Sequence, residues 1–250
     1  TEPPTPPPPP TSEPLPTEPP DDVEPTATAG AYGSLTVPIL LYHHISDSVS
    51  TEYSVHPAQF DDQMKWLSDR GYSTVTISEV TRAIMNGQTL PDRPVVITFD
   101  DGYLDVYQNA YPILEKYGFY ATFFIIGNTV DTRGNLSTDQ LLALVNDGWE
   151  IGCHSMNHSY LTSGNNLEQE IVGSKELLEE KIGEAVLTFA YPYGLTNWTV
   201  TNYTINAGYT SAVGLGSNMT HSTSTLFFLH RKEIKSWYTL DFFEQFLPWK

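Results

Sequence analysis

Two short clusters of carboxylate and imidazole side chains have the types and spacing needed to bind a metal ion and activate water. Asp100 and Asp101 are adjacent and follow the apolar run at residues 95–99. His154 and His158 are four residues apart and also follow an apolar run. Together they offer one oxygen and two nitrogen ligands and leave a second carboxylate beside the metal. This inventory suits a divalent ion with an open coordination position and a base close to bound water.

Apolar runs alternate with helical patterns along most of the chain. Strands are expected at residues 37–45, 72–77, 94–100, 121–127, 150–153, 187–191, 210–215 and 227–234. Helices are expected at residues 57–70, 78–86, 103–117, 137–147, 166–182, 197–207 and 240–247. The strands are continuously apolar, as in parallel sheets covered on both faces. We therefore predict an α/β fold, an irregular (β/α) barrel of seven to eight mostly parallel strands.

The polar clusters fall where the predicted strands end. The histidine pair at 43–44, the aspartate pair at 100–101, and the segments 154–158 and 191–194 each lie at the end of one strand. In (β/α) barrels the carboxyl ends of the strands meet at one rim, which carries the chemistry. We therefore expect these side chains to converge.

The N-terminal segment has a composition that cannot form a core. Eleven of the first twenty residues are proline, and six acids occur up to Glu24, whereas the first lysine or arginine is Lys65. Such a segment favours an extended, polyproline-like spacer. We predict a Pro-rich acidic linker at residues 1–34 and one catalytic domain at residues 35–250.

The charge and the single cysteine exclude several classes of protein. The net charge of −18 argues against nucleic acid or an anionic membrane surface as a partner, and it is compatible with neutral or cationic polysaccharide. No transmembrane run occurs, and we expect a monomer. Cys153 is the only cysteine, so no internal disulfide can form. It precedes His154 on a strand, so its side chain should point away from the metal into the core.

A proline-rich spacer is typical of a domain held at a distance from an anchor. Because the chain starts at Thr1 rather than Met, we expect an upstream segment to have been removed. We therefore expect an extracellular or surface-tethered protein of a Gram-positive bacterium.

Three motifs together resemble a known enzyme family. Thr-Phe-Asp-Asp-Gly at 98–102, His-Ser-Met-Asn-His at 154–158 and Tyr-Pro-Tyr-Gly at 191–194 are similar to those of the polysaccharide deacetylases, carbohydrate esterase family 4, with the NodB-like domain. The likeness spans residues 37–247, and residues 37–45 resemble the poly-N-acetylglucosamine (exopolysaccharide) deacetylase subgroup. The resemblance implies hydrolytic removal of acetyl groups from an N-acetylglucosamine polymer of exopolysaccharide or cell wall, with release of acetate. The alternatives are an O-acetyl esterase on xylan-type polysaccharide and a non-catalytic glycan-binding domain.

The resemblance also implies roles for the two clusters. Asp101, His154 and His158 would bind the metal, and Asp100 would be the general base. Two imidazoles and one carboxylate suit Zn²⁺, at ligand distances of about 2.0–2.2 Å. Co²⁺, Ni²⁺ or Fe²⁺ could compete for the same ligands.

The segment at 191–194 would contribute to the substrate side of the site. The resemblance implies that the backbone N–H of Tyr193 stabilises the oxyanion, and that Tyr191 and Pro192 line the substrate. A turn with only a structural role is the alternative. Flat aromatic rings could form a sugar-stacking rim, with partial burial in the core as the alternative, and the candidates are Trp198, Tyr193, Tyr103 and Trp237.

The proton donor to the leaving amine has two candidates. His230 lies in a C-terminal segment that resembles the general family pattern, whereas His43 occupies the place of the acid histidine in the exopolysaccharide subgroup. Either imidazole could carry a proton near neutral pH. We favour His43, with His230 as the alternative. The neighbouring His44 could point away from the site.

Two family features are absent from the sequence. Ala190 stands where many relatives have an arginine that orients the base aspartate. Arg231 could substitute for that arginine, or it could form only a surface ion pair. No Asp-x-x-Asp-Trp motif is found near Asn197 and Trp198, so what tunes the acid histidine stays open.

Overall fold

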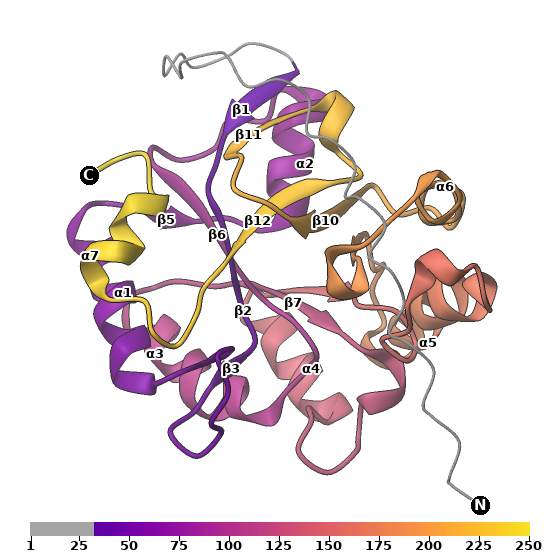
Figure 1. The fold of residues 1–250 in the computed structure, drawn as a ribbon, viewed down its shortest axis with the longest axis horizontal. Coiled ribbons are helices and arrows are strands. Elements are labelled where there is room, and N and C mark those ends of the chain that lie inside the picture. Colours follow the sequence, from indigo (N-terminus) through magenta and orange to yellow (C-terminus); the bar gives the residue numbers. More distant parts are fainter. Residues whose placement is uncertain (1–32) are drawn as a thin grey trace, which may run out of the picture.

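The computed structural model describes residues 33–250 (Figure 1). The predicted linker at residues 1–34 therefore lies outside the described residues except for Gly33 and Ser34. Strand β1 begins at Ser34, one residue before the predicted start of the domain. Among the described residues no helix is long and apolar enough to cross a membrane.

Seven parallel strands close into a barrel. They are β2 (Ile39–Tyr42), β6 (Pro94–Phe99), β7 (Thr122–Ile125), β8 (Glu150–Cys153), β9 (Thr188–Ala190), β10 (Ser211–Leu215) and β12 (Leu229–Glu233). Their order is β2-β12-β10-β9-β8-β7-β6, and pairing of β2 with β6 closes the ring. The barrel is irregular, since Cys153 and Phe189 form the one registered pair between β8 and β9. The predicted α/β barrel of mostly parallel strands is confirmed.

Five strands of two or three residues lie outside the ring. β5 (Ser73–Thr74) pairs with the first two residues of β6, and β3 (His44–Ile45) pairs with β4 (Ser54–Val55). β1 (Ser34–Thr36) runs antiparallel to β11 (Thr220–Ser222). The predicted strand at 37–45 is thus interrupted at His43, between β2 and β3. β5 lies within the strand predicted at 72–77 but spans only two residues. β1, β4 and β11 were not predicted, because such short pieces give little periodic signal.

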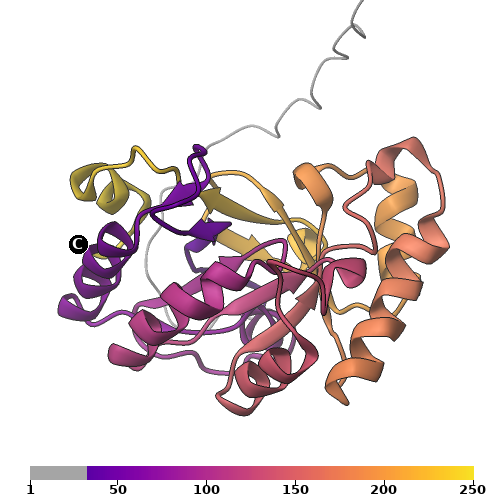
Figure 2. The same cartoon turned by 90° about the horizontal axis from the view of Figure 1, so that it is seen from below.

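Helices surround the barrel (Figures 1 and 2). They are α1 (Pro57–Asp69), α2 (Ile77–Asn86), α3 (Tyr111–Lys116), α4 (Thr138–Asn146), α5 (Ser174–Ile182), α6 (Trp198–Asn206) and α7 (Leu240–Phe243). Local sequence fixes their ends, as in α2, which begins with a Thr76–Glu79 capping box and ends at Gly87 in the left-handed region. Two predicted helices instead begin as π-helical turns, Val106–Ala110 before α3 and Glu168–Gly173 before α5.

Alternation along the strands creates two hydrophobic clusters. Side chains on one face of the strands, such as Val96, Phe124 and Leu229, pack together in the barrel interior. Those on the other face, such as Phe123 and Phe189, pack against the helices. Cys153 belongs to this outer cluster, with its Sγ 3.0 Å from Ser174 Oγ, and it points away from the metal motif as predicted. The same alternation decides which polar side chains reach the rim.

Candidate metal centre and active site

The aspartate pair lies where β6 leaves the barrel. Asp100 is 2% exposed and continues the inward-facing row of β6. The chain then turns sharply, because Asp101 and Gly102 both have left-handed backbones, with φ of 75° and 86°. A non-glycine residue in this region is strained and is held there by its surroundings. The turn lets both neighbouring carboxylates face one site, where each has an oxygen within 3.7 Å of His154 Nε2.

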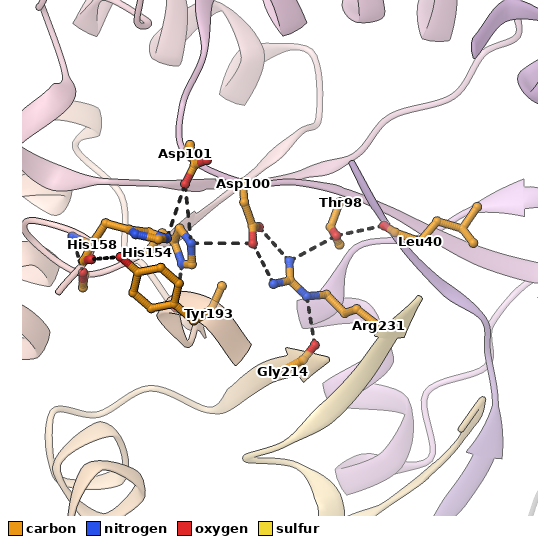
Figure 3. A network of polar contacts seen from close by, with 11 residues as sticks. Leu40, Thr98, Asp100, Asp101, His154, His158, Tyr193, Gly214 and Arg231 are labelled. Atoms are coloured by element: carbon orange, nitrogen blue, oxygen red, sulfur yellow. Dashed lines mark hydrogen bonds and ion pairs between the residues drawn. The ribbon is translucent and has the colours of Figure 1, made fainter. Parts of the chain in front are cut away.

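Three side chains from two segments converge beside this turn (Figure 3). Asp101 Oδ1 lies 3.6 Å from His154 Nε2 and 3.7 Å from His158 Nε2. The ligand atoms of the three residues all lie within 4.8 Å of one another. Among the described residues this is the only such group of three or more. The structure therefore brings together the three predicted metal ligands.

The donor set fits a divalent cation. Asp101 Oδ1 is buried and has no hydrogen-bond partner, which is costly unless a cation binds it. Nδ1 of His154 lies 2.8 Å from the carbonyl oxygen of Ala190. The carbonyl can only accept, so Nδ1 carries the proton and Nε2 keeps its lone pair facing Asp101. A histidine oriented by a backbone carbonyl is a common arrangement around protein-bound metals.

The loop between the two histidines is held in an unusual conformation. Ser155 and His158 both have left-handed backbones, with φ of 61° and 56°. The hydroxyl of Ser155 accepts a hydrogen bond from the backbone N–H of His158 at 2.9 Å. This bond closes the loop and turns the His158 ring toward Asp101.

Glu170 anchors the same loop from the π-helical turn before α5. Its carboxylate is 3% exposed and accepts hydrogen bonds from the backbone N–H and side-chain amide of Asn157 and from the hydroxyl of Ser159, at 2.8–2.9 Å. Burial raises the pKa of Glu170, but the hydrogen bonds from Asn157 outweigh it and hold the pKa below its ordinary value. No sequence motif pointed to this residue.

Asp100 forms a buried bidentate ion pair with Arg231 (Figure 3). Both guanidinium–carboxylate distances are 2.7 Å, and Arg231 is 1% exposed. The guanidinium also donates to Gly214 O and to Thr98 Oγ1, at 3.3 Å each. A fork of this kind fixes the plane of the carboxylate. Of the two possibilities for Arg231, the structure has the buried pair with Asp100 rather than a surface ion pair.

The surroundings keep Asp100 ionised. Burial alone would raise the pKa of its carboxyl group, but the charge and the hydrogen bonds of Arg231 outweigh burial and lower the pKa to about 2. The second oxygen of the carboxylate lies 3.7 Å from His154 Nε2, next to the metal ligands. Asp100 is therefore an available proton acceptor over the physiological range of pH.

Comparisons with known proteins agree with this geometry. The family profile described as "Polysaccharide deacetylase" matches residues 87–212. YxkH of Bacillus subtilis (strain 168) is 32% identical over 200 residues, which cover 79% of this chain and 71% of YxkH. The chain belongs to the polysaccharide deacetylase family. The prediction of a polysaccharide deacetylase is thereby confirmed.

Two further relatives of the deacetylase were found by sequence and by structure. The poly-β-1,6-N-acetyl-D-glucosamine N-deacetylase of Staphylococcus aureus (strain MRSA252) is 31% identical over 173 residues, 63% of this chain and 59% of the relative. This chain thus spans less than two thirds of that relative. The Streptococcus pyogenes deacetylase PplD was solved in complex with acetate. Its structure matches this chain with a TM-score of 0.79 at 28% identity, and the match covers 86% of this chain and 99% of the PplD chain.

Of the two candidate acid histidines, His43 is the one whose imidazole feels the charges of Asp100 and Asp101 in the deacetylase site. It lies at the end of β2, with its ring 5.2 Å from that of Tyr53. Its Nδ1 is buried without a hydrogen-bond partner. Burial lowers the pKa of His43, and the charges of Asp100 and Asp101 oppose that effect only in part. A protonated His43 is therefore a stronger acid than free imidazole.

His230 lies on the other face of β12 from Arg231. It sits against Gly216 and Phe228 and lines a separate cavity of about 160 Å³ with Lys232 and Met219. Neighbouring residues on a strand point to opposite faces, so with Arg231 inside the barrel His230 must be outside. The structure therefore does not bring His230 to the metal ligands, and the alternative that makes it the acid lacks geometric support.

The segment at 191–194 departs from the prediction in part. Tyr191 and Pro192 are buried, with the ring of Tyr191 packed on Phe189, so these two predicted lining residues belong to the core instead. Tyr193 is 43% exposed and has a left-handed backbone with φ of 60°. Its hydroxyl donates to the carbonyl of His158 at 3.3 Å (Figure 3). Only Tyr193 of the three therefore presents its side chain at the metal centre.

The other aromatic candidates are scattered. The ring of His44 stacks on Tyr103 at 3.7 Å, and its Nδ1 is 2.6 Å from Asp105 Oδ2, so it takes no part in the metal cluster. Burial raises the pKa of Tyr103, and the charge of the nearby Asp101 carboxylate raises it further. Trp237 lines a different cavity, and Trp198 is 81% exposed at the start of α6. The sequence-predicted rim is thus not one continuous surface.

Proposed function

We propose that this chain removes the acetyl group from N-acetylglucosamine residues of a polysaccharide and requires a divalent cation bound by Asp101, His154 and His158. The observation that carries the proposal is the unpartnered, buried oxygen of Asp101, facing two imidazoles next to the Asp100–Arg231 pair. The substrate is suggested by the relative from S. aureus, whose name specifies a poly-β-1,6-N-acetyl-D-glucosamine.

A divalent cation bound there would polarise the acetyl carbonyl and lower the pKa of a nearby water. Two imidazole nitrogens and one carboxylate oxygen favour Zn²⁺, and Co²⁺, Ni²⁺ or Fe²⁺ accept the same donors. The histidine tautomer set by Ala190 and the loop anchored by Glu170 keep these donors in place when the site is loaded.

Asp100 acts as the general base in this proposal. Arg231 holds the carboxylate plane, and the low pKa keeps the group deprotonated, so an oxygen is available for a proton of the attacking water. Because Arg231 uses both carboxylate oxygens, the proton is taken by a remaining lone pair.

Tyr193 and His43 act on the substrate side. The backbone N–H of Tyr193 donates to the oxyanion that forms on the acetyl carbonyl oxygen. His43 gives its proton to the leaving nitrogen, which produces a free amine and acetate. The left-handed backbone of Tyr193 is an observed strain at the place where this role requires a fixed amide.

The glycan-binding alternative loses the feature that favoured it. That reading depended on Ala190 replacing the arginine that orients the base, and Arg231 supplies a guanidinium to Asp100 from β12 instead. An O-acetyl esterase would use the same groups, so substrate measurements must separate the two activities.

Acetate release from a substrate panel tests the proposal. We expect release from poly-β-1,6-N-acetylglucosamine, with much lower turnover of chitin oligomers, peptidoglycan and acetylxylan. Faster release from acetylxylan than from any N-acetylated polymer would replace the proposal with the esterase. Binding of a polymer without release of acetate from any substrate would support the glycan-binding domain.

We further propose that the enzyme works outside the cell, held at the surface through its N-terminal segment. The support is compositional, since a proline-rich stretch with six acids and no basic residue up to Glu24 suits a solvated spacer. Digestion of intact cells by an added protease should remove the protein. Full protection until the cells are lysed would contradict this location.

A further inference from the structure

Two exposed tyrosine rings stack against each other next to the metal centre. The rings of Tyr160 and Tyr193 are parallel within 8°, with centres 4.0 Å apart. The ring of Tyr193 in turn lies 4.4 Å from that of His158, at an angle of 66°. The centre of the Tyr160 ring is therefore at most 8.4 Å from that of a metal ligand.

The contacts leave one ring face of this pair free. Tyr193 is covered by Tyr160 on one face, is approached by His158, and is less exposed than Tyr160, at 43%. Among the described residues, Tyr193 is the only aromatic residue whose ring contacts the ring of Tyr160. Tyr160 is 58% exposed. The outward face of Tyr160 is thus the flat apolar surface that the pair offers to solvent.

The position of this face is fixed by the fold. Leu161, the next residue, is 2% exposed and anchors a 3-10 turn at Leu161–Ser163. On the N-terminal side, Ser159 donates to the carboxylate of Glu170. Tyr193 is held by its bond to the His158 carbonyl. A rigid ring loses little entropy when a ligand binds, which suits it for recognition.

We propose that Tyr160, backed by Tyr193, is the stacking platform for a second sugar ring of the substrate, adjacent to the residue that is deacetylated. The proposal rests on the function proposed above, because it takes the ligand to be an N-acetylhexosamine polymer. The carbon face of a pyranose is flat and apolar, and an aromatic ring buries such a face well. Tyr160 lies close enough to the metal ligands for one disaccharide unit to reach both places.

The consequence is selectivity for chain length. A single sugar held for deacetylation offers no second ring to Tyr160, whereas an oligomer can occupy both positions. Loss of a stacking contact of this kind costs about tenfold in affinity. Tyr160→Ala should therefore raise KM for an N-acetylglucosamine tetramer about tenfold, leave kcat unchanged and leave KM for the monomer within twofold.

Two further variants of Tyr160 distinguish stacking of a sugar on its ring from a role that consists only of packing against Tyr193. Tyr160→Phe keeps the flat ring and should behave as the unchanged enzyme. Tyr160→Leu keeps an apolar cover on Tyr193 without a flat face, so it should resemble Tyr160→Ala while retaining the metal. Trp237→Ala is the matched control, because Trp237 is 63% exposed and lines another cavity. It should change no parameter.

Calorimetry on the metal-free protein gives a readout that does not depend on turnover. Titration with β-1,6-linked and β-1,4-linked N-acetylglucosamine tetramers should give a dissociation constant about tenfold weaker for Tyr160→Ala than for the unchanged chain. Equal dissociation constants and equal KM values for the tetramer would overturn the platform and leave the proposed function standing. Tyr160-dependent binding without acetate release would retain the platform and refute the proposed function.

Discussion

At the scale of single residues, the site depends on one arginine that lies far from the motifs. Arg231 forms a buried pair with a carboxylate 131 positions earlier, and both partners are almost inaccessible to solvent. Such a pair contributes orientation more than net stability, because both charges lose their hydration. Removing one partner is nevertheless costly, since the other charge stays buried without compensation.

Arg231→Met should therefore destabilise the fold by about 3–5 kcal/mol and abolish acetate release. Arg231→Lys keeps the charge but lacks the planar fork, so we expect an intermediate loss of both. Urea unfolding and acetate release measure the two effects. The double variant Asp100→Asn/Arg231→Met should recover most of the stability and none of the activity. A loss below about 1 kcal/mol in Arg231→Met would show that the buried pair does not form.

The two histidines permit a second test at this scale. His43→Ala should reduce acetate release by about 100-fold or more, the range for loss of a general acid, with the bound metal unchanged. His230→Ala should retain most turnover, because His230 faces the outer cavity. The comparison requires metal content to be measured in both variants. Full turnover in His43→Ala would contradict the assigned acid.

At the scale of elements, the π-helical turn before α5 supports the metal loop. Glu170 on this turn accepts three hydrogen bonds from Asn157 and Ser159, which lie between and beside the two histidines proposed to bind the metal. Ser174 further ties the turn through a bond from its hydroxyl to the Glu170 carbonyl at 2.6 Å. The turn thus connects the loop that carries His154 and His158 to α5 through hydrogen bonds.

Glu170→Ala should weaken metal affinity by about 10- to 100-fold, as expected for loss of an outer-shell partner. Competition with a chromophoric chelator measures this affinity directly. Glu168→Ala is the matched control, because Glu168 belongs to the same turn and is exposed. Equal metal affinities in the two variants would mean that the loop does not depend on Glu170.

Local motifs could be predicted from the sequence, whereas pairings across the barrel could not. Asp101, His154 and His158 each follow a recognisable strand, so the barrel rule alone brings them together. The choice between His43 and His230 depends on which face of β12 points inward. Because Arg231 and His230 are neighbours on that strand, they cannot both face the site. Tyr160 and Glu170 belong to no pattern, and the three-dimensional structure was needed to find them.

At the scale of the whole molecule, a buried histidine links stability to pH. His221 on β11 is 1% exposed, and its Nε2 lies 3.1 Å from the carbonyl of Val37. Burial lowers its pKa to about 4, and the bond to Val37 opposes that effect only in part. The unfolded chain therefore binds a proton at higher pH than the folded chain does.

The contribution of neutral, buried His221 to the free energy of unfolding is thus fully present above about pH 6.5 and is lost as the pH falls toward 4. The loss is on the order of 3 kcal/mol. His221→Gln should flatten the pH dependence of the unfolding free energy in this range, whatever its effect on stability at neutral pH. The exposed His56→Asn serves as control. An unchanged slope in His221→Gln would contradict the assignment.

The central proposal is that the barrel brings Asp101, His154 and His158 together to bind one divalent cation. The direct measurement is acetate release from poly-β-1,6-N-acetylglucosamine as a function of bound metal, with metal content determined by elemental analysis. The account predicts that chelated protein releases no acetate and that activity returns linearly up to one divalent ion per chain. His154→Ala should bind no ion and recover no activity. Undiminished acetate release by protein without metal would contradict the account.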